Sequence, residues 1–92
     1  MSEQTIRQLK IVNQKGLHAR AAAKLVEVVE GFDATAEVSH EGQSTNADSI
    51  MGLLMLAASK GKTIDVETSG PDAEALADAI EALVADRFGE DM

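Results

Sequence analysis

The chain has 92 residues, a formal net charge of −8, two phenylalanines and no tryptophan, tyrosine or cysteine. This length suits one domain with a modest core, so we expect a single domain over residues 1–92. The lack of cysteine excludes disulfides and thiolate metal sites, and acidity with few aromatic rings argues against a nucleic-acid partner.

The N-terminal half is predicted to hold three strands and one helix. Residues 5–13 alternate as a strand, and 13–16 form a turn. A helical pattern begins at Ala19, and Gly31 is expected to end it as a C′ residue. Two strands follow, at 34–40 and at 43–46. The side chains expected inside are Leu9, Ile11, Ala22, Leu25, Val26, Val29, Ala36 and Val38.

The C-terminal half is predicted to hold two helices and one strand. A helix is expected over 49–58, with Lys60–Gly61 breaking it, and residues 62–68 alternate as a strand. Gly70-Pro71-Asp72 is typical of a helix start, so a last helix should cover 72–88. The side chains expected inside are Ile64, Val66, Leu76, Ala79, Ile80 and Leu83.

These elements follow the order β-α-β-β-α-β-α. Every predicted strand alternates, so each has one face in water, which favours an antiparallel sheet over a parallel one. The simplest packing places all three helices on one face of the sheet. The fold class expected is therefore α+β, an open-faced sandwich of a four-stranded antiparallel sheet and three helices.

The segment that indicates function is Gly16-Leu17-His18-Ala19-Arg20, where a turn leads into the first helix. Backbone amides at a helix start lack intrahelical partners, and with the helix dipole they favour an anion. The guanidinium of Arg20 can grip a phosphate with two hydrogen bonds. A neutral imidazole is a nucleophile toward phosphorus, so His18 is predicted to carry a phosphoryl group.

Charge is distributed unevenly along this acidic chain. Between Gln4 and Val26 there are five basic residues and no acid, whereas Glu27 to Ser59 contains acids and no lysine or arginine. A chance cluster on a solvated face would explain this, but the pattern also suits an anionic ligand or an acidic partner.

Two further polar residues, His40 and Ser49, are candidates for a functional role. His40 lies beside a turn among acids, so we expect it to be a surface residue without chemistry. Ser49 stands where a helix N-cap belongs, and its hydroxyl is also a possible phosphorylation site. Met51 and Leu54 are expected on an exposed face nearby, where apolar residues can mark a partner surface.

No apolar run reaches the roughly 20 residues that span a bilayer, and the N-terminus lacks a basic segment followed by an apolar one. We therefore expect a soluble cytoplasmic monomer that does not insert into membranes. No metal and no cofactor is expected.

Gly-Leu-His-Ala-Arg, followed by a small-residue helix and by Asp48-Ser49-Ile50-Met51-Gly52, resembles the phosphocarrier protein HPr family of the phosphoenolpyruvate-dependent phosphotransferase system. The resemblance covers nearly the whole chain. The segments at 31–34, 53–56 and 69–71 resemble its nitrogen-regulatory (NPr) branch most.

The resemblance implies a phosphoryl carrier rather than an enzyme. His18 would be phosphorylated through Nδ1 by enzyme I or its nitrogen-branch paralogue and would pass the group to an enzyme IIA histidine. Arg20 and the backbone of Ala19 and Arg20 would bind the phosphate, and Ser49 would be the serine that an HPr kinase/phosphorylase modifies. The partner-binding residues implied are Leu17, Lys24, Ile50, Met51 and Leu54.

One position departs from the family pattern, which usually has proline after the arginine where this chain has Ala21. Alanine is a good helix former and adds one amide at the helix start, so we expect the site to function with slightly more fraying.

An alternative reading is an acyl-carrier-like protein that uses Ser49 of Asp48-Ser49-Ile50 as its prosthetic-group attachment site. That family is all helical, whereas three segments of this chain alternate with the period of strands. A purely structural adaptor would leave the basic cluster near His18 unexplained.

Overall fold

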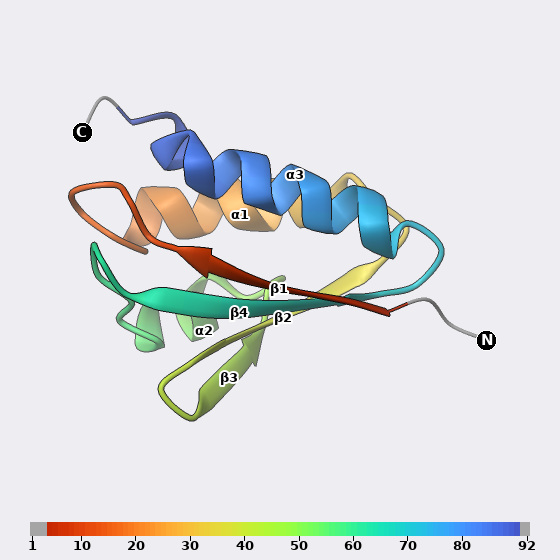
Figure 1. Ribbon diagram of the computed structural model, residues 1–92, viewed down its shortest axis with the longest axis horizontal. Coiled ribbons are helices and arrows are strands. Elements are labelled where there is room, and N and C mark those ends of the chain that lie inside the picture. The colour runs from red at the N-terminus through yellow and green to blue at the C-terminus, as the bar shows by residue number, and fades with distance from the viewer. Residues whose placement is uncertain (1–3, 91–92) are drawn as a thin grey trace.

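The computed structural model describes residues 4–90. The predicted domain extends to residues 1–3 and 91–92, which lie outside the described part. The described elements are β1 (Gln4–Lys10), α1 (Ala19–Glu30), β2 (Thr35–His40), β3 (Gln43–Asn46), α2 (Ile50–Met55), β4 (Thr63–Ser69), α3 (Ala73–Ala85) and a short 3₁₀ turn (Arg87–Gly89). Their order is the predicted one (Figure 1).

The four strands form one sheet in the order β1-β4-β2-β3, and every neighbouring pair is antiparallel. β4 therefore lies between β1 and β2, and two connections run over the sheet rather than through tight hairpins. α1 and α3 lie over one face of the sheet (Figure 1). α2 contacts α1 and β3. The predicted α+β open-faced sandwich is confirmed.

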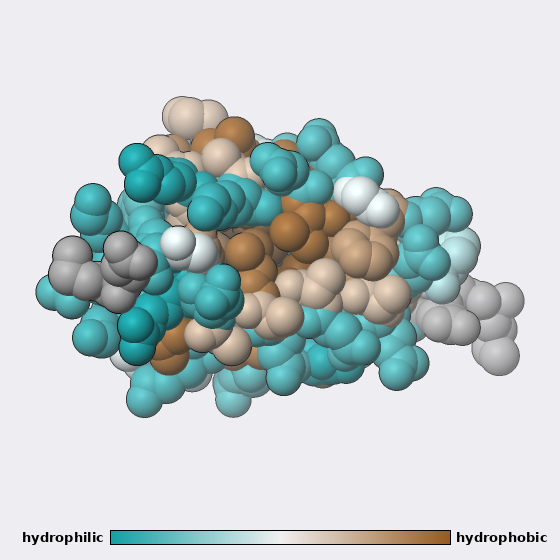
Figure 2. All heavy atoms as spheres, turned by 90° about the horizontal axis from the view of Figure 1, so that it is seen from above, coloured by the Kyte–Doolittle hydropathy of each residue, from teal (hydrophilic) through white to brown (hydrophobic). Residues whose placement is uncertain are grey.

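The core lies between this face and the helices. The strand residues expected inside, Leu9, Ala36, Val38, Ile64 and Val66, are all buried, and Ile11 is buried just beyond β1. α1 buries Ala22, Leu25 and Val29 as expected, together with Ala21, while Val26 is only partly buried. Seen from above in Figure 2, apolar atoms form a band on the helical face with hydrophilic atoms around it.

α3 is rotated slightly from the predicted face. Leu76 and Ile80 are buried as expected, and Ala77 and Val84 are buried as well, whereas Ala79 and Leu83 are only partly buried. The regular helix also ends at Ala85 instead of continuing to residue 88. Packing against β1, β4 and α1 decides which face of this largely apolar helix is buried.

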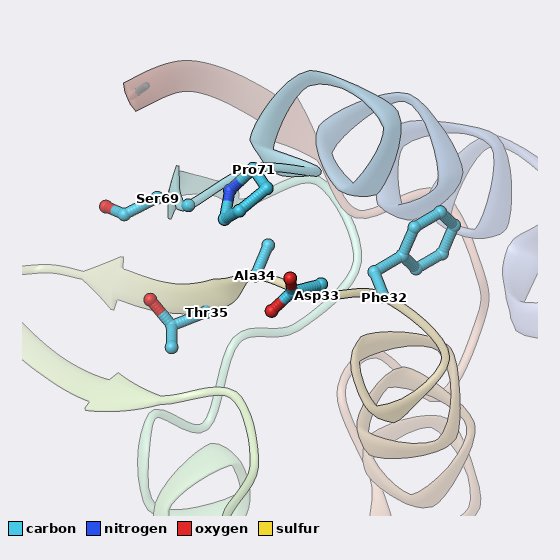
Figure 3. A pocket seen from close by; sticks show the side chains of 7 residues that line it. Phe32, Asp33, Ala34, Thr35, Ser69 and Pro71 are labelled. Carbon is cyan, nitrogen blue, oxygen red and sulfur yellow. The ribbon is translucent and has the colours of Figure 1, made fainter. Parts of the chain in front are cut away.

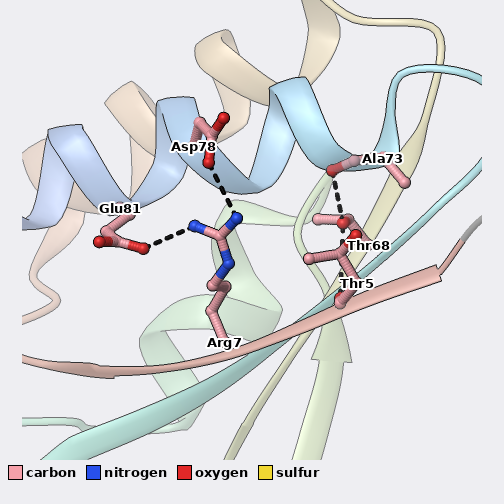
Figure 4. A network of polar contacts seen from close by, with 6 residues as sticks. All are labelled: Thr5, Arg7, Thr68, Ala73, Asp78 and Glu81. Atoms are coloured by element: carbon pink, nitrogen blue, oxygen red, sulfur yellow. Dashed lines mark hydrogen bonds and ion pairs between the residues drawn. The ribbon is translucent and has the colours of Figure 1, made fainter.

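Polar contacts join α3 to two strands of the sheet, β1 and β4 (Figure 4). The guanidinium of Arg7 on β1 donates to Asp78 at 2.9 Å and to Glu81 at 2.6 Å. The buried hydroxyl of Thr68 on β4 donates to the carbonyl oxygen of Ala73 at 2.7 Å, which satisfies it inside the core. These contacts keep α3 in one register over β1 and β4.

Two helix ends differ from the prediction. α2 ends at Met55 rather than residue 58, because Ala57 has left-handed backbone angles (φ 51°) and cannot continue a helix. Gly31 does end α1, but with φ −83° it closes the helix without the left-handed conformation of a C′ glycine.

Candidate functional site

A hydrogen-bonded turn carries the chain from β1 to α1. Asn13 is completely buried, and its Nδ2 donates to the carbonyl oxygen of Gly16 at 2.8 Å. The backbone N–H of Gly16 donates back to the Asn13 carbonyl oxygen at 3.2 Å. The turn is therefore held from within its own sequence, and it delivers His18 to the start of α1.

Gly16 also allows this turn to meet the loop that follows α2. Its φ is +64°, and an added Cβ would lie 2.5 Å from the carbonyl oxygen of Ala58 and 2.8 Å from Cα of Ser59. That same Ala58 oxygen accepts the N–H of Leu17 at 2.9 Å. This close approach connects the His18 turn to the end of the α2 segment.

His18 is the N-cap residue of α1, with extended backbone (φ −86°, ψ −177°) and no side-chain capping bond. Its carbonyl oxygen accepts the first helical hydrogen bond, from Ala22, at 2.8 Å. Within residues 4–90, no hydrogen bond uses the amides of residues 19–21, and the first turn of α1 contains no acid. An unneutralised helix start of this kind attracts an anion.

The side chains around this helix start are mainly basic. Arg20 is exposed, and within the described residues it makes no ion pair, so its guanidinium is available to a ligand. Lys15 is exposed as well, and Lys24 one turn further along α1 is half-buried. Ala21, in the place of the usual proline, is fully buried and packs as part of the core.

An acidic residue that sequence reasoning did not select completes the site. Nε2 of His18 contacts Oε2 of Glu90, and the other carboxylate oxygen accepts Nδ2 of Asn13 at 2.8 Å. Glu90 is 72 positions away from His18, so no local spacing could have revealed the pair. The hydrogen bond from Asn13 holds the pKa of Glu90 below its ordinary value against the opposing effect of burial, with smaller contributions from His18 and Lys15.

Ser49 is confirmed as the N-cap of α2. Its Oγ accepts the backbone N–H of Gly52 at 3.0 Å, and the residue is half-buried. Behind it, Ile50 and Met51 are 40% and 70% exposed, while Leu54 is partly buried. Met55, which sequence reasoning did not select, is 75% exposed. We call the set Ile50, Met51, Leu54 and Met55 the α2 apolar patch.

Two single residues, Leu17 and His40, are more buried than the sequence suggests. Leu17 is buried at 4% exposure, because the turn folds its side chain into the core, and its part in partner binding stays a prediction. His40 is also buried, at 8% exposure, and its Nδ1 contacts the carbonyl oxygen of Thr63 at 3.0 Å. The expectation that His40 is a surface residue is therefore wrong. The residue lies at the end of β2, and the neighbouring strand β4 covers its side chain.

One pocket of the described chain lies far from His18. The shallow pocket in Figure 3 is formed by residues 32–35 and 69–71, beyond the C-terminal end of α1, so the helix length of about 18 Å separates it from His18. No group of three or more His, Cys, Asp or Glu side chains in residues 4–90 is placed to hold a metal ion. None of the described helices has the length and apolarity to cross a membrane.

Comparisons with known proteins give a consistent result. Residues 6–86 match the protein family described as "PTS HPr component phosphorylation site". The chain is 48% identical to phosphocarrier protein HPr of Cupriavidus necator, covering 91% of this chain and 94% of that protein. It is 43% identical to phosphocarrier protein NPr of Escherichia coli strain K12, covering 95% and 99%.

Solved structures agree with the sequence comparisons. The crystal structure of HPr-C-His from Thermoanaerobacter tengcongensis is similar with a TM-score of 0.90 and 33% identity, covering 96% of this chain and 99% of that one. The four-stranded sheet is incompatible with the all-helical acyl-carrier alternative, which is therefore wrong.

Proposed function

The chain belongs to the HPr family of phosphocarrier proteins of the phosphotransferase system, and we propose that it carries its phosphoryl group on His18. A phosphocarrier of this family is a carrier and not an enzyme, and it interacts with the enzymes of that system. The observation that supports His18 is its position as N-cap of α1, half-buried, in front of amides that have no partner in residues 4–90.

The proposed donor is enzyme I, or its nitrogen-branch paralogue, in its phosphohistidine form. Nδ1 of His18 attacks phosphorus in line, the new N–P bond forms, and the N–P bond of the donor breaks with its electron pair returning to the donor ring. The amides of Ala19 and Arg20, with the Arg20 guanidinium, stabilise the charge on the equatorial oxygens. A later in-line transfer moves the group to a histidine of an enzyme IIA.

The assignment is tested by labelling from phosphoenolpyruvate and enzyme I. His18→Ala should abolish acid-labile phosphorylation, whereas His40→Gln, which removes the other histidine, should retain it. Circular dichroism of both variants checks that the fold persists. Undiminished labelling of His18→Ala would refute the assignment.

Arg20 is tested by the rate of the same transfer. Arg20→Ala should slow phosphorylation about tenfold or more without lowering the melting temperature, since the side chain is exposed and contacts a ligand rather than the protein. Lys10→Ala is the matched control, because it removes an exposed cation of β1 that points to the face opposite Leu9 and the helices. Equal rates for the two variants would remove Arg20 from the site.

We also propose that the α2 apolar patch, with Lys24, binds the partner enzymes. The support is exposure: three of its four residues are exposed hydrophobics, which are costly in water unless a partner covers them. Met51→Asp should weaken binding of enzyme I. Ile6→Asp is the control, because Ile6 is 67% exposed on β1 and points to the face opposite Leu9 and the helices. Equal weakening by both would contradict the proposal.

Ser49 is proposed as a regulatory phosphorylation site for an HPr kinase/phosphorylase. Its Oγ lies at the start of α2, directly before the patch, so a phosphate there would add negative charge and bulk where the partner docks. Ser49→Asp should slow transfer from enzyme I, and an unchanged rate would count against this regulation.

A further inference from the structure

We propose that Glu90 is a positioning residue that, held by Asn13, fixes the tautomer of His18 so that Nδ1 is the free nucleophile. This inference rests on the proposed function, in which His18 accepts the phosphoryl group. It adds Glu90, which is 72 positions from His18 in the sequence, to the site, and it explains why Nδ1 rather than Nε2 of His18 reacts.

The geometry assigns the hydrogen on the ring. An ionised carboxylate only accepts hydrogen bonds, so the nitrogen that faces Oε2 of Glu90, which is Nε2, must be the one that carries the hydrogen. In a neutral imidazole the other nitrogen then has the lone pair. The side chain of Glu90 is only 13% exposed, so water competes little for this contact.

Asn13 keeps the carboxylate in place and ionised. Its Nδ2 donates to Oε1 of Glu90 and to the carbonyl oxygen of Gly16, both at 2.8 Å. Asn13 is fully buried, and its own Oδ1 has no hydrogen-bond partner within the described chain. A buried amide with one unsatisfied atom costs free energy, so both donated bonds must compensate for it. Asn13 therefore couples the His18 turn directly to Glu90.

The backbone after α3 directs Glu90 back toward α1. Arg87, Phe88 and Gly89 have φ of 56°, 53° and 78°, three left-handed residues in succession, of which two are not glycine. Each non-glycine costs about 1 kcal/mol or more in this conformation and persists only where packing requires it. Phe88, completely buried, supplies that packing. In Figure 1 the end of α3 lies at the same end of the molecule as the start of α1.

A fixed Nε2–H also assists the transfer itself. When the N–P bond forms at Nδ1, the ring gains positive charge while its Nε2 hydrogen stays in place. The carboxylate of Glu90 faces this hydrogen and stabilises the charge as it develops. A carboxylate that orients an imidazole and stabilises its cation plays the same part in hydrolase triads.

The test reads the tautomer directly, without phosphate, from ¹⁵N chemical shifts of His18 at a pH at which the ring is neutral. In the wild type, Nε2 should give the shift of a protonated nitrogen and Nδ1 that of an unprotonated one. Glu90→Ala should lower the ratio of the Nε2-protonated to the Nδ1-protonated tautomer roughly tenfold or more, since a hydrogen bond to a charged acceptor is lost. Glu90→Gln keeps an accepting oxygen and should retain most of the preference.

Rates and a control complete the experiment. Glu90→Ala should be phosphorylated by enzyme I roughly tenfold more slowly, and Glu90→Gln should lie between it and the wild type. Glu30→Gln, which removes an exposed acid at the far end of α1, should leave both tautomer and rate unchanged. A wild-type ring protonated at Nδ1, or a ratio that Glu90→Ala leaves unchanged, would overturn the inference. Because the tautomer is measured without phosphate, this failure is distinct from continued labelling of His18→Ala, which would refute the proposed function.

Discussion

Gly16→Ala should destabilise the protein strongly and slow phosphotransfer, because two separate penalties coincide at this residue. Its φ of +64° is unfavourable for an alanine, and the new methyl group would lie 2.5 Å from the Ala58 carbonyl oxygen. Both neighbours that it meets are backbone atoms, so no side chain can rotate away to relieve the clash. The turn that positions His18 must then shift.

The magnitude follows from these two penalties. A left-handed alanine costs about 1–2 kcal/mol, and the reduced entropy of the unfolded chain returns about 0.4–1 kcal/mol. Moving packed backbone apart adds about 1–3 kcal/mol. We therefore expect the free energy of unfolding to fall by about 1–5 kcal/mol, centred on about 3, a large share of the about 5–15 kcal/mol typical of a domain.

Gly42→Ala is the matched control. Gly42 also has a left-handed backbone, with φ +83° in the turn between β2 and β3, but an added Cβ would meet nothing within 4 Å. It should lose only about 1 kcal/mol and transfer phosphate at the normal rate. Urea denaturation of both variants, with initial rates from enzyme I, measures the difference. Equal losses of stability would show that the approach to Ala58 does not constrain the turn and would refute this reasoning.

Three further predictions concern other parts of the molecule. Ser49→Ala should lower the free energy of unfolding by about 1 kcal/mol, because the N-cap bond to α2 is lost, and a loss within error in urea denaturation would contradict the cap. Arg7→Gln should lower the melting temperature, and added salt should reduce the difference from the wild type; a salt-independent difference would argue against ion pairs with α3. The pKa of Glu90 is lowered by folding, so its stabilisation is complete above the ordinary glutamate range and is lost as the pH falls through the depressed value. The stability difference between the wild type and Glu90→Gln should therefore be largest at neutral pH and shrink in acid, and a difference that grows on acidification would be the wrong sign.

Much of the fold could be predicted because the local spacing of apolar and polar residues indicates each strand and helix. Strands with one face in water alternate, and the turn at residues 41–42 predicts the strand at 43–46 that the structure shows as β3. Element ends were less predictable. α2 stops three residues early because Ala57 adopts a left-handed conformation, and alanine itself signals the opposite.

Burial of single residues could not be predicted from the sequence. His40 is surrounded by acids along the chain, but the sheet order places β2 beside β4, where the Thr63 carbonyl oxygen meets the ring. Leu17 sits in a polar turn whose closure on Ala58 turns its side chain inward. Both outcomes depend on contacts between segments far apart in sequence.

The sequence by itself determined the order of strands and helices, the glycine turn and the identity of His18 as a helix N-cap, since these depend on residues a few positions apart. Only the tertiary structure decided which carboxylate faces that histidine. Glu90 reaches Nε2 because the buried ring of Phe88 holds a left-handed turn at the end of α3 and the buried amide of Asn13 binds the carboxylate. The physical reason is that packing joins residues 72 positions apart, a relation that no local pattern of polarity or spacing encodes.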